Sequence, residues 1–193
     1  MSYKPEFGDI AHVGHVELLT PDLEKSANFF KDVIGLHESG RAPQSVYLRA
    51  WGDYERHTLQ LTLAALPGLG HVAFRMRSGE VLQEIVNHLK AHGVSGEWKT
   101  PSFGHGPAFR FRSPDDHLLE LYFATERHEI KPGERRAFKN LPQGYVARGI
   151  APKRLDHLNL LASDVKACRE FFHQLLGLRI TEQIIFGEEE MGA

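Results

Sequence analysis

A chain of 193 residues with 41% hydrophobic and 25% charged side chains has the composition of an ordinary globular protein. The formal net charge of −2 gives no reason to expect a nucleic acid or an acidic membrane surface as a partner. The sequence has no apolar run of membrane-helix length, no signal-peptide core in MSYKPEFGDI and a single cysteine, Cys168, so we expect a cytoplasmic protein without an intramolecular disulfide.

The first predicted unit begins with a short apolar strand, VGHVELL, at 13–19. A helix over 23–34 follows, because Thr-Pro-Asp at 20–22 is a typical helix start and apolar residues then recur with the 3.6-residue spacing. Gly35 is expected to end this helix. Two short strands, SVYLRAW and HTLQLTLA, are predicted next, at 45–51 and 57–64.

A second unit repeats this order. It opens with the strand GHVAFRM at 70–76, continues with the helix GEVLQEIVNHLKAHGV and has Gly93 as the residue that ends the helix. Two more strands are predicted at 108–114 and 117–124, joined by Pro-Asp-Asp. Residues 9–124 therefore hold two units, each with one strand, one helix and several further strands.

A third unit copies the first near the other end of the chain. The stretch HVELLTPDLEKSANFFKDVIGL starts at His15, and HLNLLASDVKACREFFHQLLGL starts at His157, so matching positions differ by 142 (157 − 15). The third unit holds one strand, one helix and the start of another strand before FGEEEMGA. We expect an incomplete domain whose helix keeps an unburied apolar face, because half a sheet cannot cover it.

The expected fold class is α+β, built from paired βαβββ modules on a curved sheet. The predicted organisation is a domain of two modules over 1–130, a charged linker with Pro and Gly over 131–150, and the first half of module three over 151–193.

Three residues occupy matching places in the first two units. His15 and His71 lie on the first strand of units one and two, and Glu120 lies on the last strand of unit two. If the two units curl toward each other, the three side chains converge on one point. Two histidines and one carboxylate on one side of a metal leave other positions open, which suits non-haem Fe(II) and oxygen chemistry.

Each of these residues also has a purely structural interpretation. A lone histidine on a strand is usually a hydrogen-bonded structural residue. Glu120 could instead pair with Arg110 or Arg112 on the neighbouring predicted strand. His105 and His117 flank loops, and we expect them at the surface.

Five segments in order carry a resemblance to a known family: HVGHVELLTPDLEKSANFFKDVIGL, VYLRAWGDYERHTLQL, GLGHVAFRM, SPDDHLLELYF and RLDHLNLLASDVKACREFFHQLLGL. The modules resemble those of the vicinal oxygen chelate superfamily, which has the glyoxalase and bleomycin-resistance fold. The chain is similar to type I extradiol ring-cleavage dioxygenases of the catechol 2,3-dioxygenase group. Members of that group carry four modules in two domains, and this chain holds two modules and about half of the third.

The resemblance implies a metal, Fe(II) and sometimes Mn(II), in the second domain. The first ligand of that metal carries over to His157, while the other two would come from module four, which this chain does not include. A chain without bound metal is compatible with this incomplete set. His15, His71 and Glu120 occupy the equivalent positions of the first domain, which in this family usually serves as a vestigial structural duplicate.

The first domain lacks the residues that support catalysis around the metal in this family. Where the family's catalytic domain has an acid–base histidine and a tyrosine before the glutamate ligand, this domain has Pro101 and Arg110. Neither residue can do that work, so the catalytic residues stay unknown. The resemblance therefore favours His157 over the first-domain set as the residue with a role in catalysis.

The resemblance also implies an activity, the cleavage of catechol-type rings next to the hydroxyls with Fe(II) and O2 when the second domain is complete. The expected partners are a small aromatic diol from aromatic hydrocarbon catabolism, O2 and further copies of the chain in a homo-oligomer, with no nucleic acid and no membrane. Two alternatives stay open: a non-catalytic small-molecule-binding protein without metal dependence, and a glyoxalase-like metal-dependent lyase.

Overall fold

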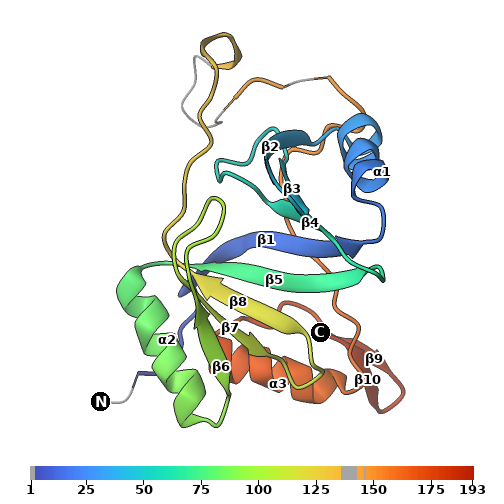
Figure 1. The fold of residues 1–193 in the computed structure, drawn as a ribbon. Coiled ribbons are helices and arrows are strands. Elements are labelled where there is room, and N and C mark those ends of the chain that lie inside the picture. Colours follow the sequence, from blue (N-terminus) through green and yellow to red (C-terminus); the bar gives the residue numbers. More distant parts are fainter. Residues whose placement is uncertain (1–2, 136–142, 146) are drawn as a thin grey trace.

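The computed structural model describes residues 3–135, 143–145 and 147–193. Eight strands form one sheet with the order β2-β3-β4-β1-β5-β8-β7-β6 (Figure 1). The first module comprises β1 (Ile10–Thr20), α1 (Leu23–Asn28), a π-helical turn η1 (Phe29–Ile34), β2 (His37–Ala42), β3 (Ser45–Arg49) and β4 (Leu59–Leu63). The second comprises β5 (Gly68–Met76), α2 (Gly79–Ala91), β6 (Gly96–Lys99), β7 (Ala108–Arg112) and β8 (Leu118–Tyr122). Two βαβββ modules confirm the predicted fold class.

The two modules are related by an approximate two-fold axis. β1 pairs with β4 and β5 pairs with β8, both in parallel, while β1 and β5 run antiparallel between the modules. Val16 lies opposite Leu59 in the first module, and Val72 lies opposite Leu119 in the second. This register makes His15 equivalent to His71, and it makes Gln60 equivalent to Glu120.

Strands β2 and β6 were not predicted from the sequence. Their segments, HESGRA and GEWK, have no apolar–polar alternation. Both strands lie at the outer edges of the sheet, where polar and short strands are usual because no further strand pairs with them. The predicted helix over 23–34 is also divided, since the α-helix gives way to a π-helical turn after Asn28.

Alternation along the central strands separates two faces of the sheet. Leu119 and Leu121 of β8 pack with Val72 and the apolar side of α2 in one hydrophobic cluster. Because successive strand residues point to opposite faces, Glu120 is directed away from this cluster. The opposite face of the sheet therefore carries buried polar residues, among them His15, His71 and Glu120.

A bulge in β1 lies beside the side chain of Tyr122. The register with β5 shifts between Val13 and His15, and a Cβ atom at Gly14 would lie 2.0 Å from the Tyr122 hydroxyl. Only glycine leaves room for this approach.

The helix of the third unit lies against the first domain, as Figure 1 shows beside α2. Helix α3 (Val165–Leu176) was expected to leave its apolar face unburied, and this prediction was wrong. Phe171 is 8% exposed and Leu176 fully buried, and both join the cluster around α2. The Phe171 ring lies 6.2 Å from that of Phe111. The apolar surface of the second module thus provides the cover that half a sheet lacks.

The strand predicted around His157 is not formed. Residues 151–162 contain no strand, and β9 (Ile184–Phe186) pairs only with β10 (Glu189–Gly192). A strand requires a neighbour to accept its backbone hydrogen bonds, and the described residues offer none here. Part of the predicted linker, 136–142 and 146, lies outside the described residues, and its described part holds one short 3-10 turn (Pro132–Glu134). No described helix has both the length and the apolar character needed to span a membrane.

Phe171→Ala tests the docking of α3. We expect the free energy of unfolding to fall by about 3 kcal/mol, because the substitution leaves a cavity in a shared core. Phe186→Ala is the control, since Phe186 is 82% exposed and its loss should change stability by no more than about 0.5 kcal/mol. Equal effects of the two substitutions in urea unfolding would show that α3 is not docked.

Gly14→Ala tests the close approach of β1 to Tyr122. The added methyl group must displace a buried ring, so we expect a loss of about 1–3 kcal/mol in the free energy of unfolding. Gly68→Ala on β5 is the matched control, because its Cβ atom would have no neighbour within 4 Å. Unchanged stability of Gly14→Ala would contradict the bulge geometry.

Candidate functional site

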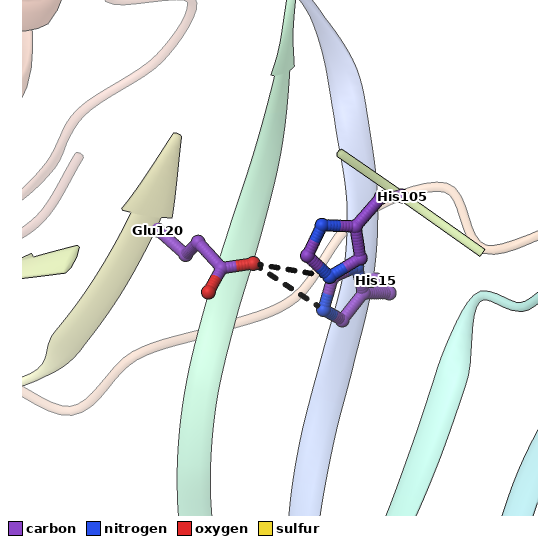
Figure 2. Close-up of side chains that lie close together, drawn as sticks. All are labelled: His15, His105 and Glu120. Atoms are coloured by element: carbon purple, nitrogen blue, oxygen red, sulfur yellow. Dashed lines mark ion pairs between the residues drawn. The ribbon is translucent and has the colours of Figure 1, made fainter. Parts of the chain in front are cut away.

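Four side chains from separate segments meet on the face of the sheet opposite α2. His15 comes from β1, His71 from β5, Glu120 from β8 and His105 from the loop between β6 and β7. Their exposed fractions are 1%, 0%, 0% and 7%. Figure 2 shows His15, His105 and Glu120 pointing toward one another. We call these four residues the histidine–glutamate cluster.

The distances within the histidine–glutamate cluster are those of a compact group. The Nε2 atoms of His15 and His71 are 2.9 Å apart. Glu120 Oε1 lies 3.8 Å from Nε2 of His15, 3.8 Å from Nε2 of His71 and 3.6 Å from Nε2 of His105. Ligand atoms of His15, His105 and Glu120 all lie within 4.8 Å of one another, close enough to hold one metal ion.

The position of His105 differs from the prediction, which placed it at the surface. Backbone bridges join His105 to Ser102 and to Thr125, so the loop folds back over the sheet. Gly104 has a φ of +82°, and a Cβ atom there would lie 3.0 Å from His57 Nδ1. The Gly-His-Gly sequence at 104–106 was the signal that could have revealed this tight loop. His117, the other histidine expected at the surface, is half-buried and contacts the Ser113 hydroxyl.

The Nδ1 atoms of two cluster histidines, His71 and His105, each lie beside a hydrogen-bond acceptor. His71 Nδ1 lies 2.8 Å from a carboxylate oxygen of Glu17, and His105 Nδ1 lies 2.8 Å from the Gly106 carbonyl oxygen. Burial raises the pKa of Glu17, but hydrogen bonds from His71 and Thr62 bring it below its usual value. Each Nδ1 atom therefore donates a proton, and in a neutral ring Nε2 is left with a lone pair.

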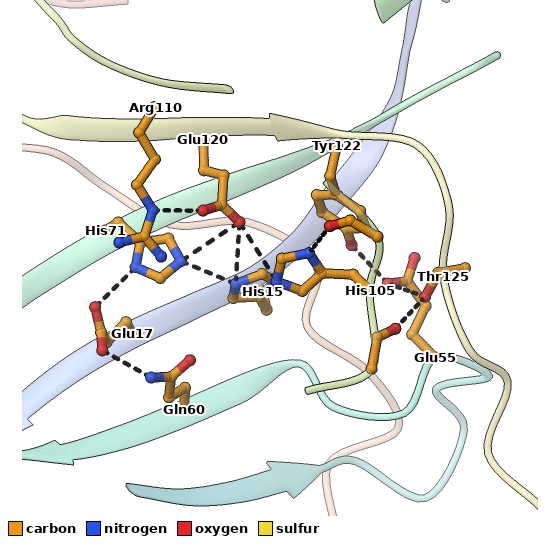
Figure 3. Close-up of polar contacts among 12 residues, drawn as sticks. His15, Glu17, Glu55, Gln60, His71, His105, Arg110, Glu120, Tyr122 and Thr125 are labelled. Atoms are coloured by element: carbon orange, nitrogen blue, oxygen red, sulfur yellow. Dashed lines mark hydrogen bonds and ion pairs between the residues drawn. The ribbon is translucent and has the colours of Figure 1, made fainter. Parts of the chain in front are cut away.

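The two carboxylate oxygens of Glu120 face different groups (Figure 3). Oε2 accepts a hydrogen bond of 2.5 Å from Arg110 Nε, so the structural interpretation of this glutamate holds for one oxygen. Oε1, the oxygen that faces the histidines, has no hydrogen-bond partner among the described residues. Arg112, the other arginine considered, pairs with Asp116.

The surroundings favour the neutral form of two imidazoles here, those of His15 and His57. Burial, followed by the neighbouring histidines, lowers the pKa of His15 well below its usual value. Burial and the nearby His105 lower the pKa of His57 to about 3, and its ring centre is 4.6 Å from that of His15. Neutral imidazole is the form that binds metals.

A second hydrogen-bond network, centred on Glu55, lies beside the cluster. The Tyr122 hydroxyl donates to Glu55 at 2.5 Å, and the same carboxylate contacts Thr125 at 3.1 Å and His12 at 2.7 Å. The Tyr122 ring lies 5.0 Å from that of His105. Sequence reasoning did not find this network, because it joins a loop residue to two strands that are distant in sequence.

The cluster does not line either of two cavities in the structure. One, of about 930 Å³, lies between the amino-terminal segment, α2 and α3. The other, of about 350 Å³, is lined by β1, residues 52–58 and residues 154–156.

His157 stands apart from the cluster. Its side chain is 81% exposed, and its Nδ1 atom lies 3.4 Å from Asp156 Oδ2. Among the described residues, the group that could hold a metal ion consists of His15, His105 and Glu120, and it includes neither His157 nor His71. The structure therefore brings together His15, His71 and Glu120, adds His105, and leaves His157 alone.

Comparison with curated proteins finds a metapyrocatechase and a dioxygenase among the relatives. The chain is 39% identical over 176 residues to a metapyrocatechase of Geobacillus stearothermophilus, a match that covers 91% of this chain and 54% of that protein. It is 36% identical over 178 residues to a manganese-dependent 2,3-dihydroxybiphenyl 1,2-dioxygenase of Geobacillus genomosp. 3, covering 91% and 56%. The chain thus spans about half the length of these relatives.

Solved structures show the same fold. An extradiol ring-cleaving dioxygenase from B. fuscum superposes with a TM-score of 0.81 at 30% identity, covering 97% of this chain and 49% of that one. The 2,3-dioxygenase LapB from Pseudomonas sp. KL28 superposes with a TM-score of 0.83 at 24% identity, covering 95% and 65%. These relatives confirm the resemblance to extradiol dioxygenases. Residues 12–121 match the family model, more than half of the chain, and the chain therefore belongs to the Glyoxalase/Bleomycin resistance protein/Dioxygenase superfamily.

Proposed function

We propose that this chain is part of an extradiol dioxygenase that uses O2 to cleave a catechol-type aromatic ring next to its hydroxyls. The observation that carries the proposal is the 39% identity to a metapyrocatechase, which extends along 91% of the chain. Because the match extends over 176 of the 193 residues, it includes His157 whichever residue it begins at. The metal is proposed to be Fe(II) or Mn(II), and one relative is named manganese-dependent. A cytoplasmic homo-oligomer remains our expectation from the sequence.

We do not propose ring cleavage at the histidine–glutamate cluster, because its side chains are buried and a substrate could not reach a metal there. A diol that chelates a metal needs open coordination positions and a path to them. Every cluster side chain is at least nine-tenths buried, and Arg110 already occupies one oxygen of Glu120. Pro101 and Arg110 also stand where the family has its acid–base histidine and tyrosine.

His157 is proposed as one ligand of the ring-cleavage metal. In this chain the residues around it do not hold a metal by themselves, since Asp156 is its only ionic partner in the described residues. The remaining ligands would come from the part of the relatives' length that this chain does not span. When bound, such a metal supplies a template for the diol and a route for electrons to O2.

A chimera tests this assignment. Residues 1–193 would be joined to the remaining part of the Geobacillus stearothermophilus metapyrocatechase, loaded with iron under anaerobic conditions and assayed with catechol by the yellow ring-cleavage product. We expect turnover by the chimera and a loss of roughly 100-fold or more in kcat/KM on His157→Ala, because a site of three protein ligands that loses one releases its metal.

The matched control is His117→Ala, which removes a half-buried histidine whose side chain contacts Ser113 and should leave kcat/KM unchanged. Turnover that survives His157→Ala and disappears with Glu120→Ala would show that catalysis belongs to the first domain. A chimera that binds iron without cleaving catechol would refute the proposed activity.

A further inference from the structure

We infer that the first domain positions His157, and that the side chains of Trp51, Asp53 and Asp115 are the positioning residues. Trp51 and Asp53 hold the chain before His157, and Asp115 holds it after. The inference rests on the proposed function in one respect, since it takes His157 as a ligand of the ring-cleavage metal. It concerns a different part of the first domain from the histidine–glutamate cluster.

One short segment of the first module contacts the chain that leads to His157. This is RAWGD, residues 49–53, which spans the end of β3 and the turn after it, and we call it the RAWGD segment. We call residues 143–145 and 147–155 the strap. In Figure 1 the strap passes beside α1 on its way to α3.

The later part of the strap is hydrogen-bonded to the RAWGD segment. The Trp51 indole N–H donates to the Ala151 carbonyl oxygen at 3.0 Å. The Gly52 backbone N–H donates to the Lys153 carbonyl oxygen at 2.8 Å. The second of these bonds lies only four residues before His157.

Asp53 extends these contacts to Leu155. Asp53 is 8% exposed, and its carboxylate accepts hydrogen bonds from the Ala50 backbone N–H at 3.0 Å and from the Thr58 hydroxyl at 2.7 Å. Burial raises the pKa of the Asp53 carboxyl, and a hydrogen bond from the Leu155 backbone is among the contacts that oppose this rise. A buried carboxylate requires such donors, so Asp53 holds the backbone two residues before His157.

The beginning of the strap is held by the fully buried guanidinium of Arg49. Its Nη1 atom donates to Gln143 Oε1 at 2.6 Å, and its Nη2 atom donates to the carbonyl oxygens of Trp51 and Asp53. A planar guanidinium fixes the directions of its acceptors. Arg49 therefore ties the beginning of the strap to the same segment that binds its end.

The middle of the strap lies against the end of η1. The backbone N–H groups of Ile150 and Ala151 donate to the carbonyl oxygens of Val33 and Ile34, at 3.0 and 2.9 Å. A Cβ atom at Gly149, which has a φ of +55°, would lie 2.3 Å from the Val33 oxygen. The strap thus docks on the first module by its backbone as well as by side chains.

The chain is held again beyond His157. Asp115 lies in the turn between β7 and β8, and its carboxylate accepts hydrogen bonds from the hydroxyl and the backbone N–H of Ser163. Ser163 directly precedes Asp164, the residue that caps α3. His157 is 81% exposed, on a stretch without regular structure between Leu155 and Ser163. Its imidazole therefore projects from a short segment whose two ends are both fixed to the first domain.

A metal ligand needs support of this kind. Residues that orient a ligand contribute to metal affinity although they do not touch the metal. A ligand displaced by more than about 0.5 Å no longer fits the coordination geometry. The first domain thus has a role in ring cleavage that requires no catalytic residue of its own.

The first test is hydrogen exchange of the 193-residue chain, followed by mass spectrometry. Trp51→Phe keeps an aromatic ring but removes the N–H that binds Ala151. We expect the backbone amides of 148–156 to exchange roughly 3- to 10-fold faster, because about one hydrogen bond is lost. Exchange within α2 should not change, which separates this effect from global destabilisation. Trp98→Phe, on the edge strand β6 and 42% exposed, is the matched control and should leave the strap unchanged.

Asp115 gives a second pair of variants at a partly exposed position, and this pair carries the test if Trp51→Phe does not fold. Asp115→Ala should speed exchange at 157–164, since it removes both acceptors of Ser163. Asp115→Asn keeps one acceptor oxygen and should retain most of the protection.

The second test measures iron affinity in the chimera described above, by anaerobic competition with a chelator. Trp51→Phe and Asp115→Ala should each lower iron affinity by roughly 10-fold, whereas Trp98→Phe should not. This readout requires no turnover, so a chimera that binds iron without cleaving catechol would refute the proposed activity and still test the inference. Unchanged exchange in both variants would show that the strap is not anchored by these residues. Faster exchange with unchanged iron affinity would overturn the positioning of His157.

Discussion

The structure depends on one fully buried carboxylate, Glu120, at the centre of an eight-stranded sheet. A buried charge is tolerated only when hydrogen bonds and opposite charges replace its lost hydration. Arg110 provides this for one oxygen, while the other faces three imidazoles and has no hydrogen-bond partner among the described residues. This oxygen and the three imidazoles form the buried polar centre of the first domain.

Duplication of a βαβββ unit accounts for most of the arrangement around that carboxylate. Because β1 and β5 pair antiparallel at the centre, the first-strand histidines of both modules meet across the two-fold axis. The symmetry is then broken at two places. Gln60 replaces the second carboxylate, and the loop bearing His105 folds over the sheet. In this account the first domain keeps a buried polar cluster, and the ring-cleaving chemistry is proposed for His157 together with the part of the relatives that this chain does not span.

The sequence predicted the features that depend on local periodicity, and it missed those that depend on tertiary contacts. Period-two and period-3.6 patterns located the central strands and the helices, and the repeat predicted that His15 and His71 would be equivalent. The edge strands β2 and β6 lack such a pattern. His105 was missed because a loop's path over the sheet is not encoded in its own periodicity. The docking of α3 was missed because the apolar surface that receives Phe171 is formed only when module two has folded.

Anomalous X-ray diffraction from crystals of the iron-loaded chimera, recorded on both sides of the iron absorption edge, tests the assignment of catalysis most directly. The account predicts an anomalous peak beside the imidazole of His157. A peak among His15, His105 and Glu120, with none beside His157, would contradict it.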